Sequence, residues 1–140
     1  MEIDFEFPRN TKNYKCNLVL SSNDRLHVQQ KANITKRIRQ LAHYQMKSEL
    51  NKASYERYSE AKPCVVTVKV GRSDKRLFDP PNLYPTIKAI MDGFTDAGLW
   101  IDDNYNVIRS MTFLKSERVA KKGFYIFEIE VRDYEEEKYF

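Results

Sequence analysis

The chain has 140 residues and a formal net charge of +4, and 41% of its residues are hydrophobic and 13% aromatic. This length suits one globular domain, and the aromatic content excludes an intrinsically disordered chain. No run approaches the roughly 18 apolar residues of a membrane span, and the acidic start MEIDFEF is no secretory signal. We therefore expect a soluble, cytoplasmic single domain over residues 1–140, with only the acidic tail, 133–140, departing from a folded pattern.

The first predicted strand covers residues 14–20, YKCNLVL, which alternate and are rich in β-forming residues. The turn-forming sequence SSND follows, and it places Asn23 and Arg25 at the end of that strand. Cys16 belongs to this run, and Cys64 belongs to a later apolar run. Both are predicted to be buried thiols in a reducing compartment.

A long amphipathic helix is predicted for residues 30–52. Apolar residues recur there at helical spacing in two rows, which are Ile34, Ile38, Leu41 and Tyr44, and Ala42, Met46 and Leu50. Basic residues occupy much of the rest of the circumference, among them Lys36, Arg39 and Lys47. The pattern predicts a helix that buries one side and presents a basic outer face.

A second strand is predicted for residues 64–70, because CVVTVKV is rich in β-branched residues. The polar loop GRSDKRLF then carries Lys75 and Arg76 and leads to Asp79. Two prolines follow Asp79, and a residue before a proline is kept out of the α region. Asp79 should therefore lie just outside a helix, on extended backbone.

A short helix follows, with Pro85 in its first turn and Gly98 after its end. Its apolar stripe is Ile87, Ile90, Met91, Phe94 and Ala97. Trp100, the only tryptophan, is predicted to be an anchor in the core or at a dimer interface. Strands are predicted for residues 107–114 and 124–131. Together these elements predict an α/β (α+β) fold, in which a mixed sheet packs with one long and one short helix.

Three carboxylates flank the short helix, because Asp79 precedes it and Asp102 and Asp103 follow it. If the flanking loops converge, these carboxylates would suit a hard divalent cation, magnesium or manganese, which prefers oxygen ligands. The alternative is turn chemistry, in which Asp is common. Within the helix, Lys88 and Asp92 lie one turn apart, so Asp92 could join the metal ligands or hold Lys88 in an ion pair.

The run DPPNLYPTIKAIMDGFTDAGLWIDDNYNVI resembles the signature of the RusA-like Holliday-junction resolvases of bacteriophages and prophages. The matching positions are Asp79, Asn82, Leu83, Lys88, Asp92, Ala97, Gly98, Asp102, Asp103 and Val107. The resemblance is weaker elsewhere, although SSNDRLH, residues 21–27, is similar to the family's N-terminal turn.

The resemblance implies a homodimeric, magnesium-dependent endonuclease that cuts four-way DNA junctions. Asp79, Lys88 and Asp103 would be its catalytic residues, with Lys88 at the scissile phosphate. The candidate metal ligands are Asp79, Asp92, Asp102 and Asp103. A cation at the phosphate would stabilise transition-state charge and lower the pKa of bound water. The candidate DNA contacts are Asn23, Arg25, His27, Lys75, Arg76 and Asn82.

Two departures from the family pattern leave other functions open. Pro81 stands where the family has a second acidic residue, and extra residues separate Leu83 from Lys88. Because proline cannot bind a metal through its side chain, one alternative is a catalytically inactive DNA-binding relative. Another is an interaction factor of a phage replication or packaging pathway that docks through its acidic tail, residues 135–137.

Overall fold

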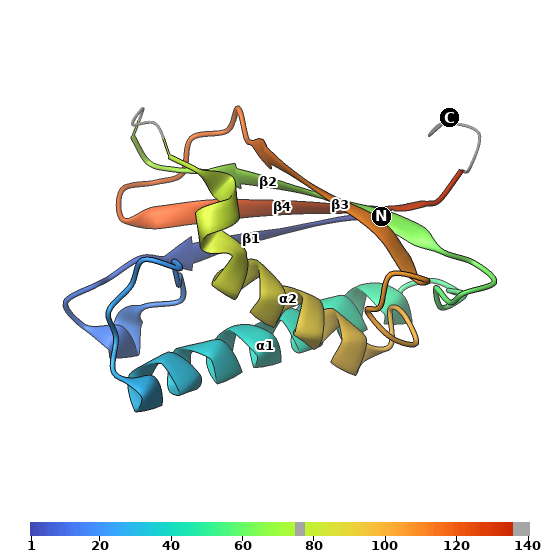
Figure 1. Ribbon diagram of the computed structural model, residues 1–140, viewed down its shortest axis with the longest axis horizontal. Helices are drawn as coiled ribbons and strands as arrows, with labels where there is room; N and C mark the ends of the chain where they lie inside the picture. Colours follow the sequence, from blue (N-terminus) through green and yellow to red (C-terminus); the bar gives the residue numbers. More distant parts are fainter. Residues whose placement is uncertain (75–77, 136–140) are drawn as a thin grey trace.

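The computed structural model describes residues 1–74 and 78–135. They form one four-stranded mixed sheet, in the order β1-β4-β2-β3, and two α-helices (Figure 1). The strands are β1, Glu2–Pro8; β2, Cys64–Gly71; β3, Ile108–Lys115; and β4, Phe124–Asp133. The helices are α1, Val28–Asn51, and α2, Tyr84–Ala97. The predicted fold class, a mixed sheet with one long and one short helix, is confirmed.

The connection that positions the candidate site is the β2-α2-β3 unit. β2 and β3 pair in parallel, so the chain must return across the sheet between them, and α2 makes that return. β4 is antiparallel to both of its neighbours, β1 and β2. α1 packs against α2, so the two helices lie together over the sheet (Figure 1). Neither helix in the described part of the chain has the length and hydrophobicity needed to cross a membrane.

One core joins side chains from all four strands and both helices. The predicted stripe of α2 is buried along its whole length. In α1 the buried row is Ile34, Ile38, Ala42 and Met46. Leu41 and Tyr44, which were predicted to be in the buried stripe, are 45% and 83% exposed. The prediction for these two was wrong because the four buried residues lie four apart on one side of the helix, and Leu41 and Tyr44 fall outside that row.

The two helices approach each other closely at Gly93. A Cβ built there would lie 2.5 Å from the Arg39 carbonyl oxygen and 2.7 Å from the Ala42 Cβ. We expect Gly93→Ala to destabilise the fold by about 1–3 kcal/mol, because overpacking outweighs the roughly 1 kcal/mol that alanine gains over glycine in a helix. Urea unfolding measures the difference. A variant as stable as the wild type would show that the helices can separate without cost.

The predicted strand over residues 14–20 is wrong. A 3-10 helix, η1, Tyr14–Cys16, begins there, and the rest of the run is irregular. Asparagine side chains cause the difference, since the Asn13 side-chain oxygen accepts from the Lys15 N–H at 3.1 Å. The Asn17 side-chain oxygen likewise accepts from the Asn10 N–H at 3.0 Å. Such local hydrogen bonds give the backbone an alternative to strand pairing.

The strand that sequence analysis missed is β1. Ile3, Phe5 and Phe7 are buried and the acidic residues between them are exposed, which is the alternation of a strand with one face in the core. β1 pairs with β4 along its whole length, from Glu2 to Pro8. The alternation of apolar and acidic residues in Glu2–Pro8 is the sequence signal for this strand.

The two cysteines differ from each other. Cys64 is buried at the start of β2, and burial raises the pKa of its thiol to about 12, so it stays protonated at neutral pH. Cys16 is exposed in η1. The prediction of two buried thiols was therefore wrong for Cys16, because residues 14–20 do not form the strand that would have carried it into the core.

Candidate active site

A lysine of α2, Lys88, is held between two carboxylates. The Lys88 Nζ donates to Asp92 Oδ1 at 2.8 Å and to Asp103 Oδ2 at 2.9 Å. Asp92 is one helical turn after Lys88, and the chain that leaves α2 folds back to bring Asp103 to the same ammonium. These hydrogen bonds raise the pKa of Lys88. We call Lys88, Asp92 and Asp103 the Lys88 cluster.

Asp102 supports the cluster without facing Lys88. Its Oδ1 accepts from the Asp103 N–H at 2.8 Å, and its Oδ2 accepts from the Asn104 side-chain amide at 3.1 Å. Asp102 therefore makes the turn chemistry that was the alternative to a metal site. The carboxylate of Asp103 is left for Lys88, whose hydrogen bond lowers the pKa of Asp103 below its usual value. Asp103 is thus ionised at neutral pH.

Stability alone does not explain the Lys88 cluster. The side chains of Lys88 and Asp103 are 45% and 32% exposed. Ion pairs in such positions contribute only about 0–1 kcal/mol to folding. Asp92 and Asp103, both part-buried, therefore place two carboxylates around one cationic group at the surface of the protein.

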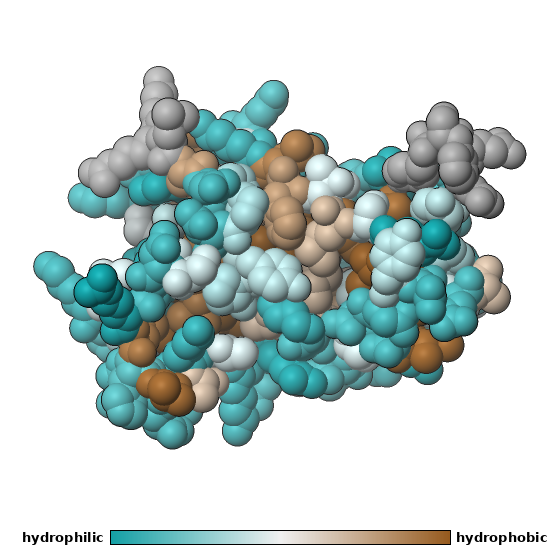
Figure 2. All heavy atoms as spheres, viewed as in Figure 1, coloured by the Kyte–Doolittle hydropathy of each residue, from teal (hydrophilic) through white to brown (hydrophobic). Residues whose placement is uncertain are grey.

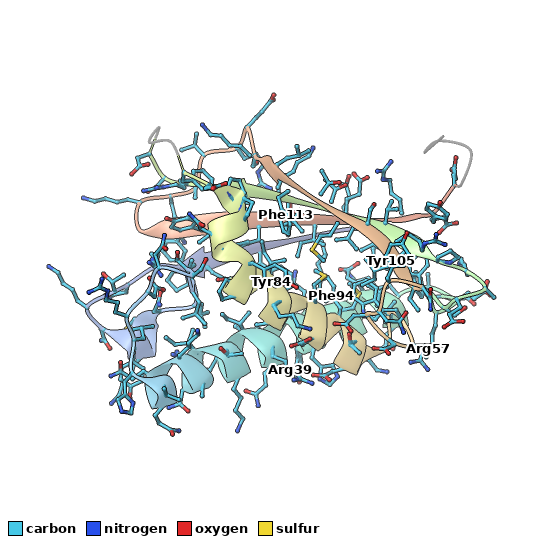
Figure 3. All side chains as sticks on the ribbon, viewed as in Figure 1. Arg39, Arg57, Tyr84, Phe94, Tyr105 and Phe113 are labelled. Atoms are coloured by element: carbon cyan, nitrogen blue, oxygen red, sulfur yellow. The ribbon has the colours of Figure 1, made fainter. Side chains whose placement is uncertain are left out.

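Lys88 and Asp103 of this cluster form part of the wall of an open groove of about 340 Å³ between α2 and β3, and Asp92 stands behind Lys88, outside the residues that line it. Tyr84 of α2, Phe113 of β3 and Tyr105 of the preceding loop line it (Figure 3). The rings of Tyr84 and Phe113 meet edge to face at 6.3 Å. Tyr84 and Tyr105 remain 45% and 68% exposed. The groove is also lined by Met91, Ile108, Arg109, Ser110 and Met111.

Arg109 was not identified from the sequence, although it lies on this groove. Its guanidinium sits over the rings of Tyr105, at 5.0 Å, and Tyr134, at 4.7 Å. Stacking between two tyrosines holds the cation at the start of β3. The readable signal was the spacing of Tyr105 and Arg109, one on each side of the start of the predicted strand.

The candidate DNA contacts gather at a second place, around the start of η2, Pro80–Leu83. Ser22 donates to the Asn82 carbonyl oxygen through its N–H, at 2.8 Å, and through its Oγ, at 2.9 Å. The turn that carries Asn23 and Arg25, both exposed, is thereby fastened next to Asn82. The structure thus brings three of the predicted contacts near one another, and Lys75 and Arg76 lie outside the described residues.

His27 has a structural role. Its Nδ1 accepts from the Gln29 N–H at 3.1 Å, which caps the first turn of α1. That hydrogen bond uses one ring nitrogen as an acceptor. The Nε2 side of the exposed ring is the part that could contact a ligand.

Asp79 does not join the Lys88 cluster. It is exposed, has extended backbone (φ −107°, ψ 104°) and precedes η2, as predicted, and it is not among the residues that line the groove. Across residues 1–74 and 78–135, no three His, Cys, Asp or Glu side chains are grouped to hold a metal ion. Asp92 and Asp103 are two carboxylates that meet at one point, the Lys88 ammonium, and magnesium often binds only one or two carboxylates together with water and substrate phosphates.

Comparison with models of known protein families finds no match to this chain, and a search of curated proteins finds none either. The resemblance of the Asp79 to Val107 run to RusA-like resolvases therefore stays a prediction from that run.

An ion pair between Arg9 and Asp24 holds the turn beside Asn82, and its contribution to stability should depend on pH. Arg9 donates to both carboxylate oxygens of Asp24, at 2.7 and 2.8 Å, and the Ser21 N–H donates to the same carboxylate at 2.9 Å. Burial alone would raise the pKa of Asp24, but these hydrogen bonds outweigh it, and the pKa lies below its usual value.

Stability from Asp24 should therefore be complete above its unfolded pKa of about 3.9 and disappear as pH falls through the lower folded pKa. We expect Asp24→Asn to destabilise the fold by about 1–3 kcal/mol at pH 7, with the difference shrinking toward pH 2. Urea unfolding of both proteins across that range measures it. A difference independent of pH would contradict the role of the charge.

Proposed function

We propose that this protein is a magnesium-dependent, structure-selective DNA endonuclease that cuts four-way junctions. The observation that carries the proposal is the Lys88 ammonium held between Asp92 and Asp103 on the wall of an open groove. All three residues belong to the run that resembles the RusA-like signature. The groove also presents exposed aromatic side chains beside the charged ones, a combination suited to sugar, base and phosphate together.

The residues divide the chemistry between them. Asp92 and Asp103 would hold the magnesium ion, which when bound stabilises charge on the phosphate and lowers the pKa of bound water. Lys88 stays protonated at neutral pH, and once it releases the carboxylates it can donate to a phosphate oxygen and offset charge on the leaving oxygen. Asp102 keeps the Asp103 loop in place through its two hydrogen bonds. Tyr84 and Tyr105 would position the substrate strand along the groove.

A homodimer belongs to this proposal. Four-way junctions have approximate two-fold symmetry, and a two-fold dimer would present two equivalent grooves to two strands. Paired, symmetric nicks would follow from that arrangement. Sedimentation of the free protein and of its junction complex would give the number of chains in each.

A catalytically inactive DNA-binding protein is the second candidate, and a specific observation favours it. Asp79 lies apart from the Lys88 cluster, and Pro81 cannot replace the missing carboxylate. Such a protein would bind junctions without cutting them. A third candidate is a phage replication or packaging interaction factor that docks through residues 135–137, of which 136 and 137 lie outside the described residues.

The deciding experiment is incubation of a labelled synthetic four-way junction with the full chain and magnesium. Linear duplex of the same sequence is the control for structure selectivity, and chelator or manganese tests the metal. The proposal predicts metal-dependent, symmetric nicks in the junction and none in the duplex. Tight binding without cutting under either metal would favour the inactive relative, and absence of binding would favour the interaction factor.

A further inference from the structure

A second surface of the protein carries concentrated positive charge away from the Lys88 cluster. Through Lys47, α1 contains no acidic residue, and its basic residues there are Lys31, Lys36, Arg37, Arg39 and Lys47. The segment from Arg9 to Cys16 ends in η1, which contacts α1; it contributes Lys12 and Lys15 and also lacks acidic residues. Hydrophilic side chains dominate the edge of the molecule where α1 lies (Figure 2).

Arg37 joins these two segments. Its Nη1 donates to the Lys15 carbonyl oxygen at 2.6 Å, and its Nη2 donates to the Tyr14 carbonyl oxygen at 2.7 Å. η1 is therefore fastened to α1, with Lys15 held near Lys36. Between them lies an open groove of about 510 Å³. Its lining side chains include no carboxylate; they are Tyr14, Lys15, Asn33, Lys36, Arg37 and Gln40.

The lysines at this groove are not neutralised by neighbours. Arg39 is paired with Asp96 at 2.6 Å, so its charge is compensated. Lys15 and Lys36, which line the groove, are exposed, and so is Lys12 in the segment before η1; within residues 1–74 and 78–135 none of the three forms an ion pair. We call Lys12, Lys15, Lys36 and Arg37, with the amides of Asn33 and Gln40, the α1 basic surface.

We propose that the α1 basic surface binds the phosphate backbone of a DNA arm, as a contact separate from the groove that holds the Lys88 cluster. Lysine, arginine and side-chain amides are the usual donors to phosphate oxygens, and such contacts carry affinity without reading sequence. α2 lies between α1 and β3, so this surface and the Lys88 groove face different parts of a bound nucleic acid (Figure 1). The inference rests on the proposed function in taking DNA as the ligand.

The test compares two variants that each remove three exposed lysine charges. The first is Lys12→Gln, Lys15→Gln and Lys36→Gln, and it spares Arg37 because that residue holds η1. The control is Lys115→Gln, Lys121→Gln and Lys122→Gln, near the β3–β4 turn. Fluorescence anisotropy with labelled linear duplex and labelled four-way junction measures affinity over a range of salt concentrations, and thermal unfolding verifies that each variant is folded.

We expect the first variant to bind both DNAs at least about tenfold more weakly, with a slope of log affinity against log salt shallower by about 2–3. The DNA affinity of the control variant should differ from that of wild type by less than about threefold. Its three lysines lie outside the proposed contact, and salt screens their charges from the DNA. Equal weakening in both variants, or none in the first, would overturn the proposal. So would binding to phosphatidylserine vesicles that the first variant loses while its DNA affinity is unchanged.

A cleavage assay distinguishes a failure of this inference from a failure of the proposed function. At saturating protein concentration the first variant should cut a junction at the wild-type rate, because the Lys88 cluster is intact. If the wild type binds DNA and never cuts it, the endonuclease proposal fails, while selective weakening of the first variant still supports the α1 basic surface. If the wild type binds neither DNA, both proposals fail.

Discussion

Asp103→Asn should reduce magnesium-dependent cleavage of a four-way junction by at least about 10²-fold while junction affinity changes by less than about threefold. Asparagine keeps the shape of the side chain and an oxygen that can accept from Lys88, but it removes the negative charge. A divalent cation held by Asp92 and Asp103 would lose half of its protein carboxylates. Single-turnover cleavage rates and anisotropy on the same labelled junction provide the two measurements.

Asp96→Asn is the matched control for that prediction. It makes the same chemical change at an exposed carboxylate of α2, which pairs with Arg39 and lies outside the Lys88 groove. Cleavage by this variant should stay close to wild type. If Asp103→Asn cuts as fast as Asp96→Asn, the Lys88 cluster has no catalytic role, and the exposed ion pairs need another explanation.

Trp100→Ala should destabilise the fold by about 3–5 kcal/mol, the range found when a large buried aromatic is truncated. Trp100 is 0% exposed, and its ring meets that of Phe94 edge to face at 6.1 Å. Its Nε1 donates to the Thr95 Oγ1 at 2.6 Å. Truncation would empty the space at the end of α2 and leave the Thr95 hydroxyl without that donor. Trp100 was predicted to be an anchor in the core or at a dimer interface, and this burial places it in the core.

Urea unfolding monitored by circular dichroism measures the effect, and Trp100→Phe separates its two parts. Phenylalanine keeps most of the apolar volume but lacks the N–H, so its loss should be smaller by about half. Trp100 also begins the segment that returns from α2 to Asp103. A loss below about 1 kcal/mol for alanine would show that this segment is held by other contacts.

Sequence patterns were sufficient to predict elements whose ends carry residues that favour starting or stopping that element. α2 was predictable because Pro85 suits its start, Gly98 adopts a φ of 90° at its end, and its apolar stripe faces the core. The structure of residues 14–20 was not predictable in this way, because β-propensity ignores the asparagine side chains that compete for the same backbone groups. β1 was not predicted although its apolar residues alternate, because the acidic residues between them have low β-propensity.

The candidate site was predictable only where it is local. The contact of Lys88 with Asp92 follows from their spacing of four in a helix, and the structure confirms it. The approach of Asp103 depends on the path of the chain after α2, which no local pattern determines. The same limit applies to Asp79, whose separation from the cluster could be seen only in the fold.

In the proposed DNA complex, the close contact at Gly93 would have a mechanical consequence. The space between α1 and α2 at Gly93 is too small for even a Cβ, so the helices are closely packed there and movement of one would disturb the other. The backbone positions that carry Lys36 on one helix and Lys88 on the other would thus keep a nearly constant separation. A nucleic acid that reaches both must bring two of its phosphates to that span, which a bent junction and a straight duplex would do to different extents. Selectivity for shape would then reside in the packing of the protein interior, with no base read directly.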